Sequence, residues 1–132
     1  MRRKATSKWS KIPSGRYRIV DLGRPAVFFI PVKKLYLGLP GRTIQEELHD
    51  FLVNRYGGYT ATTLPSFGVW RGLGDAIIND ECCVYEVSIL GKNKVKPLLE
   101  KLAELAQKMG EECIYVKAGQ YSGLVYPPNP KE

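Results

Sequence analysis

Hydrophobic and polar residues alternate along several short segments of this chain, a spacing typical of β-strands. Within residues 28–39, Leu35 and Leu37 share one face, while Lys34 and Tyr36 share the other. Pro40 follows directly and cannot donate a backbone hydrogen bond to a sheet. The pattern therefore predicts a strand over residues 28–39.

Two segments show the helical spacing of apolar residues instead. Thr43 followed by Glu46 forms a capping-box sequence, and Gly57-Gly58 provides a helix stop about a dozen residues later. A second helix is predicted from Pro97 to Met109, because proline is tolerated in a first turn and Gly110 follows. The apolar residues at helical spacing in these two segments are Ile44, Leu48, Phe51, Leu52, Leu98, Leu102 and Leu105.

Three more segments complete the expected fold. Residues 59–71, 82–90 and 112–119 read as strands, with Pro65 marking a bend, a bulge or an edge position in the first. Residues 16–22 are a further short strand candidate at the N-terminal side. The order strand, helix, strand, strand, helix, strand predicts an α+β, ferredoxin-like βαββαβ domain. Its two helices would cover one face of a four-stranded antiparallel sheet, leaving the other face open.

Three stretches carry a resemblance to a known group of proteins. They are KLYLGL, GYTATTLPSFGVWRG and EECIYVKAG. In these stretches the chain resembles small, uncharacterised ferredoxin-like proteins of bacteria and phages, over about residues 32–118. The resemblance implies the fold and implies no activity. The predicted organisation is a basic flexible tail over residues 1–14, one domain over 15–126 and a C-terminal tail over 127–132.

The net charge of +7 is concentrated at the N-terminus. Residues 1–24 contain eight basic side chains and one acidic side chain, whereas residues 25–132 contain twelve of each. A concentrated positive segment attracts polyanions such as nucleic acid, largely without sequence preference. The alternative is a solubilising arm, or one that lies beside acidic neighbours in an oligomer.

The expected open sheet face collects rings and lysines. The residues that would project from it are Lys34, Tyr36, Trp70, Val84, Glu86, Tyr115 and Lys117. Aromatic rings flanked by cations suit single-stranded nucleic acid or a nucleotide. We therefore predict a non-enzymatic protein that binds RNA or DNA through its basic arm and this face. The predicted contact residues are Arg2, Arg3, Lys4, Lys8, Arg16, Arg18, Lys34, Tyr36, Trp70, Arg71, Tyr115 and Lys117.

Other interpretations of the same residues stay open. A second subunit could cover the sheet face as a homodimer, or the chain's own ends could cover it. Alternatively, a protein of phage or mobile-element origin could bind a nucleotide or small anion as a dimer, through Tyr36, Trp70, Arg71 and Lys117. An enzyme using Glu86 or His49 has the least support. No partner for a nucleophile-base pair with His49 is visible, and Glu86, which could be a general base if buried, could equally pair with Lys34 or Lys117. No catalytic residue is predicted.

The cysteines and the lengths of the apolar runs limit the metal sites, disulfides and membrane segments that the sequence can predict. Cys82, Cys83 and Cys113 have neither metal-site spacing nor the even number of a disulfide framework, so buried free thiols are expected. No metal site or cofactor is predicted. No apolar run reaches the length of a membrane span, and the basic N-terminus lacks the apolar core of a signal peptide. We therefore expect a cytoplasmic protein.

Overall fold

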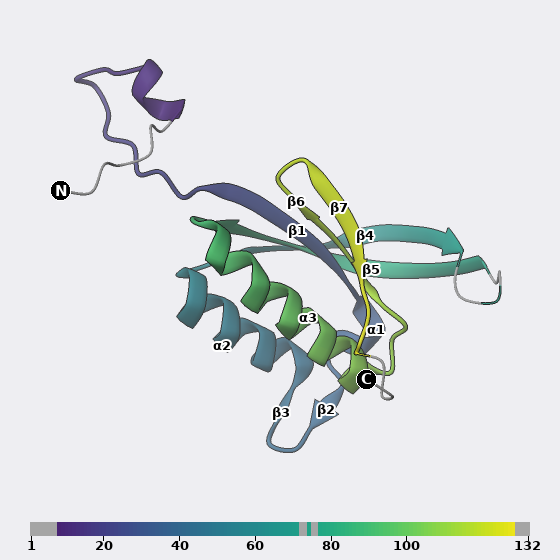
Figure 1. The fold of residues 1–132 in the computed structure, drawn as a ribbon. Helices are drawn as coiled ribbons and strands as arrows, with labels where there is room; N and C mark the ends of the chain where they lie inside the picture. The colour runs from purple at the N-terminus through teal and green to yellow at the C-terminus, as the bar shows by residue number, and fades with distance from the viewer. Residues whose placement is uncertain (1–7, 72–73, 75–76, 129–132) are drawn as a thin grey trace.

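The computed structural model describes residues 8–71, 74 and 77–128 and has an α+β architecture (Figure 1). A five-stranded antiparallel sheet has the strand order β4-β5-β1-β6-β7. Its strands are β1 (Arg24–Pro31), β4 (Thr60–Arg71), β5 (Ile77–Ile89), β6 (Ile114–Ala118) and β7 (Tyr121–Val125). The α-helices are α1 (Val32–Leu35), α2 (Ile44–Tyr56) and α3 (Val95–Met109). Smaller elements are the 3-10 helices η1 (Lys8–Lys11) and η3 (Lys92–Lys94) and the hairpin of β2 (Gly38–Leu39) and β3 (Arg42–Thr43).

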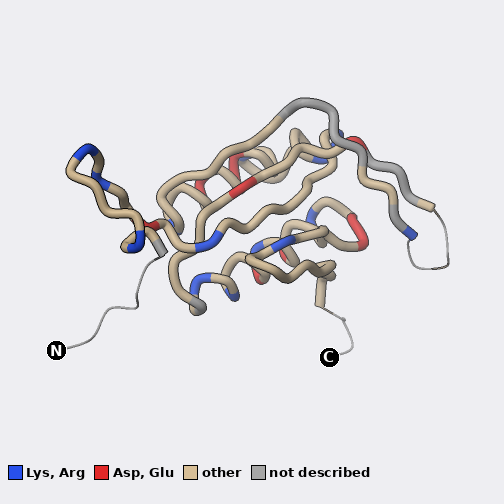
Figure 2. Tube along the Cα trace, turned by 90° about the horizontal axis from the view of Figure 1, so that it is seen from above, with Lys and Arg blue, Asp and Glu red and all other residues tan. Residues whose placement is uncertain are grey.

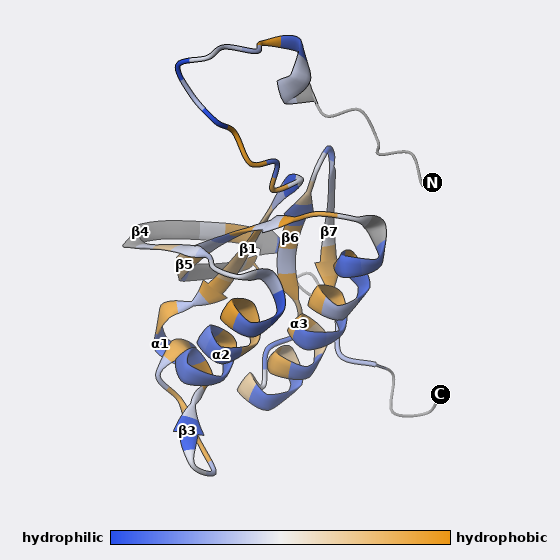
Figure 3. Ribbon diagram, turned by 90° about the vertical axis from the view of Figure 1, so that its left-hand side faces the viewer, coloured by the Kyte–Doolittle hydropathy of each residue, from blue (hydrophilic) through white to orange (hydrophobic). Residues whose placement is uncertain are grey.

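Helices α2 and α3 lie side by side on one face of the sheet, and the core fills the space between (Figures 1 and 3). Each helix turns its apolar side to the sheet and its polar side outward. The fully buried helix residues are Ile44, Leu48, Leu52, Leu98, Leu102, Leu105 and Ala106. The α+β class and the two long helices on one face are therefore confirmed.

A column of aromatic rings crosses the helix-facing side of the sheet. The rings of Phe28 on β1 and Tyr85 on β5 stack with centroids 5.3 Å apart, and Tyr59 stacks on the other side of Tyr85 at 5.5 Å. His49 of α2 meets the ring of Tyr59 edge-on at 5.7 Å. Stacked rings of this kind add to the free energy gained by burying their apolar area. The column thus connects the centre of the core to the region where β4 begins.

The ends of α2 form as the sequence predicts. The backbone N–H of Glu46 donates to Thr43 Oγ1 at 3.2 Å, and the backbone N–H of Thr43 donates to Glu46 Oε1 at 2.8 Å. Gly57 adopts a φ of 88°, a left-handed conformation that glycine takes without steric cost, and its N–H donates to Val53 O at 2.9 Å. The capping box and the glycine stop are both confirmed.

The predicted strand over residues 28–39 is wrong in its second half. Strand β1 ends at Pro31, and the chain then forms the single helical turn α1, in which Leu35 is buried. Lys34 Nζ donates to Met109 O at 2.9 Å at the end of α3 and lies 3.8 Å from Glu111 Oε2. The spacing of the leucines resembles that of a strand, although Leu35 ends the helical turn α1 and Leu39 belongs to the separate hairpin of β2 and β3.

Three other boundaries differ from the sequence prediction. Residues 16–22 form no strand, and β5 begins at Ile77, five residues earlier than predicted. Strand β7 extends the sheet to five strands, although the sequence pattern predicts none there, because Gly123 interrupts an already short alternation. The predicted irregularity at Pro65 is confirmed, since the pairing of the edge strand β4 with β5 shifts register between Thr62 and Ser66.

Two further features of the described residues concern the membrane and the thiols. None of the helices in this part of the chain has the length and apolar character needed to cross a bilayer.

Cys82, Cys83 and Cys113 are all buried and free of disulfides. Burial raises the pKa of the Cys83 and Cys113 thiols, which keeps both protonated at neutral pH.

Candidate functional site

A hollow of about 650 Å³ opens where α2 ends and β4 begins. Its volume is in the range that holds small-molecule ligands. Four parts of the chain contribute to it: the segment preceding β1, the end of α2, the paired strands β4 and β5, and η3. Besides Leu22 and Leu90, the residues that line it are Asp21, Arg55, Tyr56, Gly57, Gly58, Tyr59, Thr60, Glu86, Ser88 and Lys94.

Two tyrosines flank the glycine pair that forms the floor of this hollow. The Tyr56 hydroxyl donates to the Lys94 carbonyl oxygen at 2.7 Å, which ties the end of α2 to η3. The Tyr59 hydroxyl lies 2.9 Å from His49 Nδ1, where the tautomer of the imidazole sets the direction of the hydrogen bond. Both rings are held in place by these bonds, so the hollow has a defined aromatic lining.

The Tyr59 phenol stays protonated at neutral pH. Burial raises the pKa of Tyr59, and the proximity of Cys83 raises it further. Tyr59 also lines a neighbouring hollow of about 550 Å³ to which His49 contributes. A phenol hydrogen-bonded to an imidazole at the rim of a cavity is a pair through which a proton can move. The sequence analysis found no partner for His49, and Tyr59 is that partner.

Charged groups of both signs line the hollow at the end of α2. Glu86 and Asp21 supply carboxylates, and Arg55 and Lys94 supply cations. Glu86 lies on β5 opposite Thr60 of β4 and Val27 of β1, so strand pairing fixes its position. A ligand with an aromatic ring, a positive centre and a negative group would find a complementary group for each part here.

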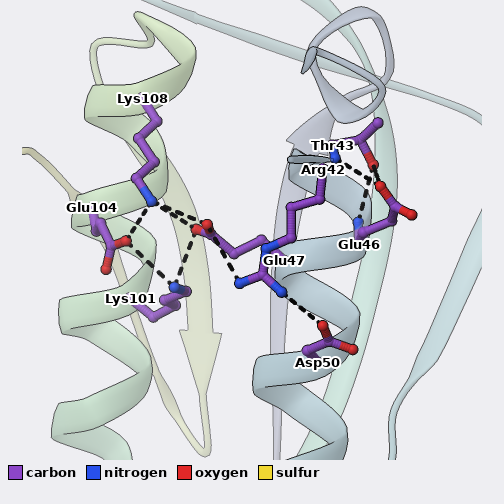
Figure 4. Close-up of polar contacts among 8 residues, drawn as sticks. All are labelled: Arg42, Thr43, Glu46, Glu47, Asp50, Lys101, Glu104 and Lys108. Atoms are coloured by element: carbon purple, nitrogen blue, oxygen red, sulfur yellow. Dashed lines mark hydrogen bonds and ion pairs between the residues drawn. The ribbon is translucent and has the colours of Figure 1, made fainter. Parts of the chain in front are cut away.

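A second charged cluster, on the outer side of α2 and α3, is a network of ion pairs (Figure 4). Glu47 of α2 is only 6% exposed, and its carboxylate lies 3.1 Å from Lys101 Nζ, 3.0 Å from Lys108 Nζ and 3.7 Å from Arg42 Nη2. Each of these cations also contacts a second carboxylate, Glu104 or Asp50. Because its charges pair internally, this cluster joins the two helices and leaves little capacity to hold a ligand.

The carboxylates of this network have lowered pKa values. Burial by itself raises the pKa of Glu47, but the hydrogen bonds from Lys108 and Lys101 outweigh it. The pKa of Glu104 is lowered chiefly by its hydrogen bond with Lys108. For both groups the folded-state pKa is below the ordinary value of 4.5. Their stabilising contribution is therefore complete above pH 4.5 and is lost as the pH falls through the lower, folded-state values.

We accordingly expect the free energy of unfolding to decrease on acidification below about pH 4.5, and to decrease less in the variant Glu47→Gln. Urea denaturation at a series of pH values measures this dependence. All other carboxylates are the same in the two proteins. An equally steep loss of stability in the variant would show that the Glu47 network is not the cause.

The predicted contact residues do not come together on one face of the sheet. Tyr115 and Lys117 do lie on its open side, where the Tyr115 ring packs 5.6 Å from Phe29. Lys34 and Tyr36 lie outside the sheet, because the chain turns into α1 after Pro31. Trp70 and Arg71 are at the far end of β4, where Arg71 is exposed and the side chain of Trp70 is outside the described residues.

The basic arm contributes to neither of the two hollows that Tyr59 lines. Arg2, Arg3 and Lys4 lie outside the described residues, and Lys8 begins η1. Arg16 and Arg18 follow in an exposed segment that extends away from the sheet and helices (Figures 1 and 2). In the part of the chain that the structure describes, no cluster of three or more His, Cys, Asp or Glu side chains could hold a metal ion.

Sequence reasoning identified Glu86 only as a weak alternative and missed the tyrosines and cations around it. The available signal was a pair of tyrosines flanking Gly57-Gly58 at the end of a well-defined helix. A glycine pair at that position reads only as a helix stop, since the approach of η3 and of Asp21 depends on tertiary structure.

No family model matches the sequence, and no curated protein matches it. Two solved structures share its fold. A phage SAM lyase in complex with S-methyl-5′-thioadenosine superimposes with a TM-score of 0.54 at 17% identity, covering 86% of this chain and 96% of that one. The phage SAM lyase in its apo state gives a TM-score of 0.54 at 16% identity, covering 86% of this chain and 97% of that one. The similarity is one of fold and extends over nearly the whole of both lyase chains.

These observations correct the predicted function. The prediction of a non-enzymatic nucleic-acid-binding protein is wrong, because the solved structures with this fold are those of an enzyme whose complex holds a small molecule. The structure also gives a physical reason, since Lys34 and Tyr36 leave the sheet and the expected surface of rings and lysines does not form. The alternative prediction, small-ligand binding, fits these findings better.

Proposed function

We propose that this protein is a small-molecule enzyme that binds S-adenosylmethionine (SAM) in the hollow at the end of α2 and releases S-methyl-5′-thioadenosine. The observation that carries the proposal is the combination of two features. The fold is similar to that of phage SAM lyase over most of both chains. The hollow carries aromatic rings and charges of both signs, as a zwitterionic adenosyl ligand requires.

The charges of SAM can be matched to those of the hollow. SAM carries a positive sulfonium and a positive amino group beside a negative carboxylate, together with a flat adenine. Glu86 and Asp21 are suited to the positive groups, and Arg55 and Lys94 to the carboxylate. The C-terminal end of α2, which carries partial negative charge, also favours a cation nearby. Tyr56 and Tyr59 offer ring surfaces for the adenine.

Two groups that could transfer a proton border this hollow from opposite faces of the sheet. Glu86 is an exposed carboxylate of β5 between the buried Tyr85 and Val87, and the Tyr59 phenol, on the helix-facing side, is hydrogen-bonded to His49 of the neighbouring hollow. Because burial raises the pKa of Tyr59, the phenol acts as a proton donor at neutral pH, leaving Glu86 as the base. In an elimination reaction of SAM, Glu86 would take a proton from the carbon next to the sulfur-bearing carbon of the amino-acid chain, and a carbon–carbon double bond would form there. The carbon–sulfur bond breaks with its electron pair left on sulfur, so S-methyl-5′-thioadenosine leaves as a neutral thioether and the four-carbon amino acid leaves as an alkene.

We also propose the finer fold assignment. The succession β1, α2, β4, β5, α3, β6 with the spatial order β4-β5-β1-β6 corresponds to the ferredoxin-like plan, to which β7 is added at one edge. This assignment places the hollow at the connection between the first helix and the second strand of the plan.

Incubation with SAM tests the proposed activity. We expect wild-type protein to consume SAM and to form S-methyl-5′-thioadenosine, both followed by chromatography. The variant Glu86→Gln should form the product at least roughly tenfold more slowly, because one charge-assisted contact is worth about 1.5–3 kcal/mol.

A matched control separates the site from general charge effects. Glu100→Gln removes an exposed carboxylate from α3 that does not line the hollow, and should leave the rate unchanged. Persistence of SAM with wild-type protein, or equal rates for wild type and Glu86→Gln, would refute the proposal.

A further inference from the structure

The segment preceding β1 exposes large apolar side chains, and of these Leu22 borders the hollow at the end of α2. In residues 17–22 the exposed fractions are 46% for Tyr17, 51% for Ile19, 69% for Val20 and 60% for Leu22. This segment appears as an apolar stretch between η1 and β1 in Figure 3. Scattered exposed apolar residues are ordinary, but four within six residues mark an interaction surface.

The backbone of residues 17–22 is also without partners. Within residues 8–71, 74 and 77–128, it makes no hydrogen bond, although its conformation is extended. Alternation places Tyr17 and Ile19 on one side and Val20 and Leu22 on the other. An extended segment with free backbone groups and apolar residues on both sides has the properties of a strand that lacks its sheet.

The sheet offers a matching edge at β7. Within the described residues β7 pairs with β6 alone, and its outer edge is exposed, with Tyr121 at 73% and Leu124 at 44%. Beside it lies a mostly apolar hollow of about 620 Å³, to which β7 contributes Tyr121 and α3 contributes Val95 and Leu99. A strand added to β7 would gain backbone hydrogen bonds, and one row of its side chains would lie toward this hollow.

Residues 17–22 cannot all pair with this edge in the same chain. Strand β7 is two positions from β1 in the sheet, so a strand beyond it lies three spacings, about 14 Å, from β1. Leu22 and Arg24 are only two residues apart and can be separated by at most about 7 Å, so Leu22 stays beside β1. Gly23 also fixes the direction in which the segment leaves, since it has a φ of 86° and a Cβ there would overlap Ile89 O.

We propose that residues 17–22 of one copy add as a strand to β7 of a second copy, so that the protein assembles by exchange of its N-terminal segments. The segment and the edge match in length, at about 20 Å and 17 Å when extended. Asp21 of this segment lines the hollow at the end of α2, but Ile19 does not, so loss of assembly in an Ile19 variant and loss of SAM turnover can be observed separately.

Light scattering during size-exclusion chromatography tests the assembly. We expect wild-type protein at micromolar concentrations to have at least twice the mass of one chain, and Ile19→Asp to have the mass of one chain. Ile19 contacts no core residue, so the variant should fold normally by circular dichroism. Ile12→Asp, an equally exposed position outside residues 17–22, is the control and should keep the wild-type mass. Wild-type protein with the mass of one chain would overturn the proposal.

Disulfide trapping tests the contact itself. Protein carrying Ile19→Cys is mixed with protein carrying Ser122→Cys and oxidised, and the native thiols contribute little because all three are buried. We expect a covalently linked pair of chains that a reducing agent separates. Ile12→Cys mixed with Ser122→Cys should link several-fold less. Equal linkage in the two mixtures, or linkage within one chain when Ile19→Cys and Ser122→Cys are combined, would contradict the exchange.

Discussion

Replacing Phe28 by alanine is expected to lower the free energy of unfolding by about 4 kcal/mol. Phe28 is fully buried on β1, and its ring stacks against Tyr85 with an interplanar angle of 7°. The substitution leaves a cavity between the sheet and the two helices and removes the central contact of the aromatic column. Urea denaturation followed by circular dichroism measures the loss.

The adjacent residue provides the control for this prediction. Phe29 projects from the opposite face of the sheet, where it is half-buried and contacts Tyr115. Phe29→Ala should therefore cost only about 1 kcal/mol. If both variants lost the same stability, the assignment of the two faces of β1 would be wrong.

Replacing Glu47 by alanine is expected to lower the free energy of unfolding by about 3 kcal/mol. The carboxylate is buried between α2 and α3, and its removal leaves Lys101 and Lys108 facing each other without the charge that they share. The cost arises mainly from the cations that lose their partner. Chemical denaturation at neutral pH, where the carboxylate is ionised, gives the value.

Glu104→Ala is the matched control for this variant. Glu104 contacts the same two lysines but is half-exposed, at 46% of its side chain, so solvent screens its interactions. Its removal should cost less than about 1 kcal/mol. Similar losses in both variants would mean that the burial of Glu47 does not determine its contribution.

Local sequence signals account for the parts of the fold that were predicted correctly. The capping box at Thr43 and the glycines after each long helix depend on neighbours three or four residues away, so the sequence reveals them. Strand β7 and the helical turn α1 depend on tertiary contacts, such as the bond from Lys34 to the end of α3. Alternation of apolar residues alone could not distinguish them from a continued strand or a loop.

The candidate site was harder to predict for the same reason. Glu86, Tyr59 and Lys94 are far apart in sequence, and only the packing of the end of α2 against β5 and η3 brings them to one hollow. The positive charge of the N-terminal segment instead favoured the prediction of a polyanion as the ligand. In the structure that segment exposes large apolar side chains as well as its arginines.

The most direct test of the proposed function is an NMR titration of the full chain, labelled with nitrogen-15, with S-methyl-5′-thioadenosine. The product is suitable because the protein does not consume it. We expect saturable shifts of the amide signals of Gly57, Gly58, Thr60, Glu86 and Ser88, and constant signals for Gln107 and Gly110 at the far end of α3. Absence of saturable shifts, or shifts confined to residues away from the end of α2, would contradict the proposed site.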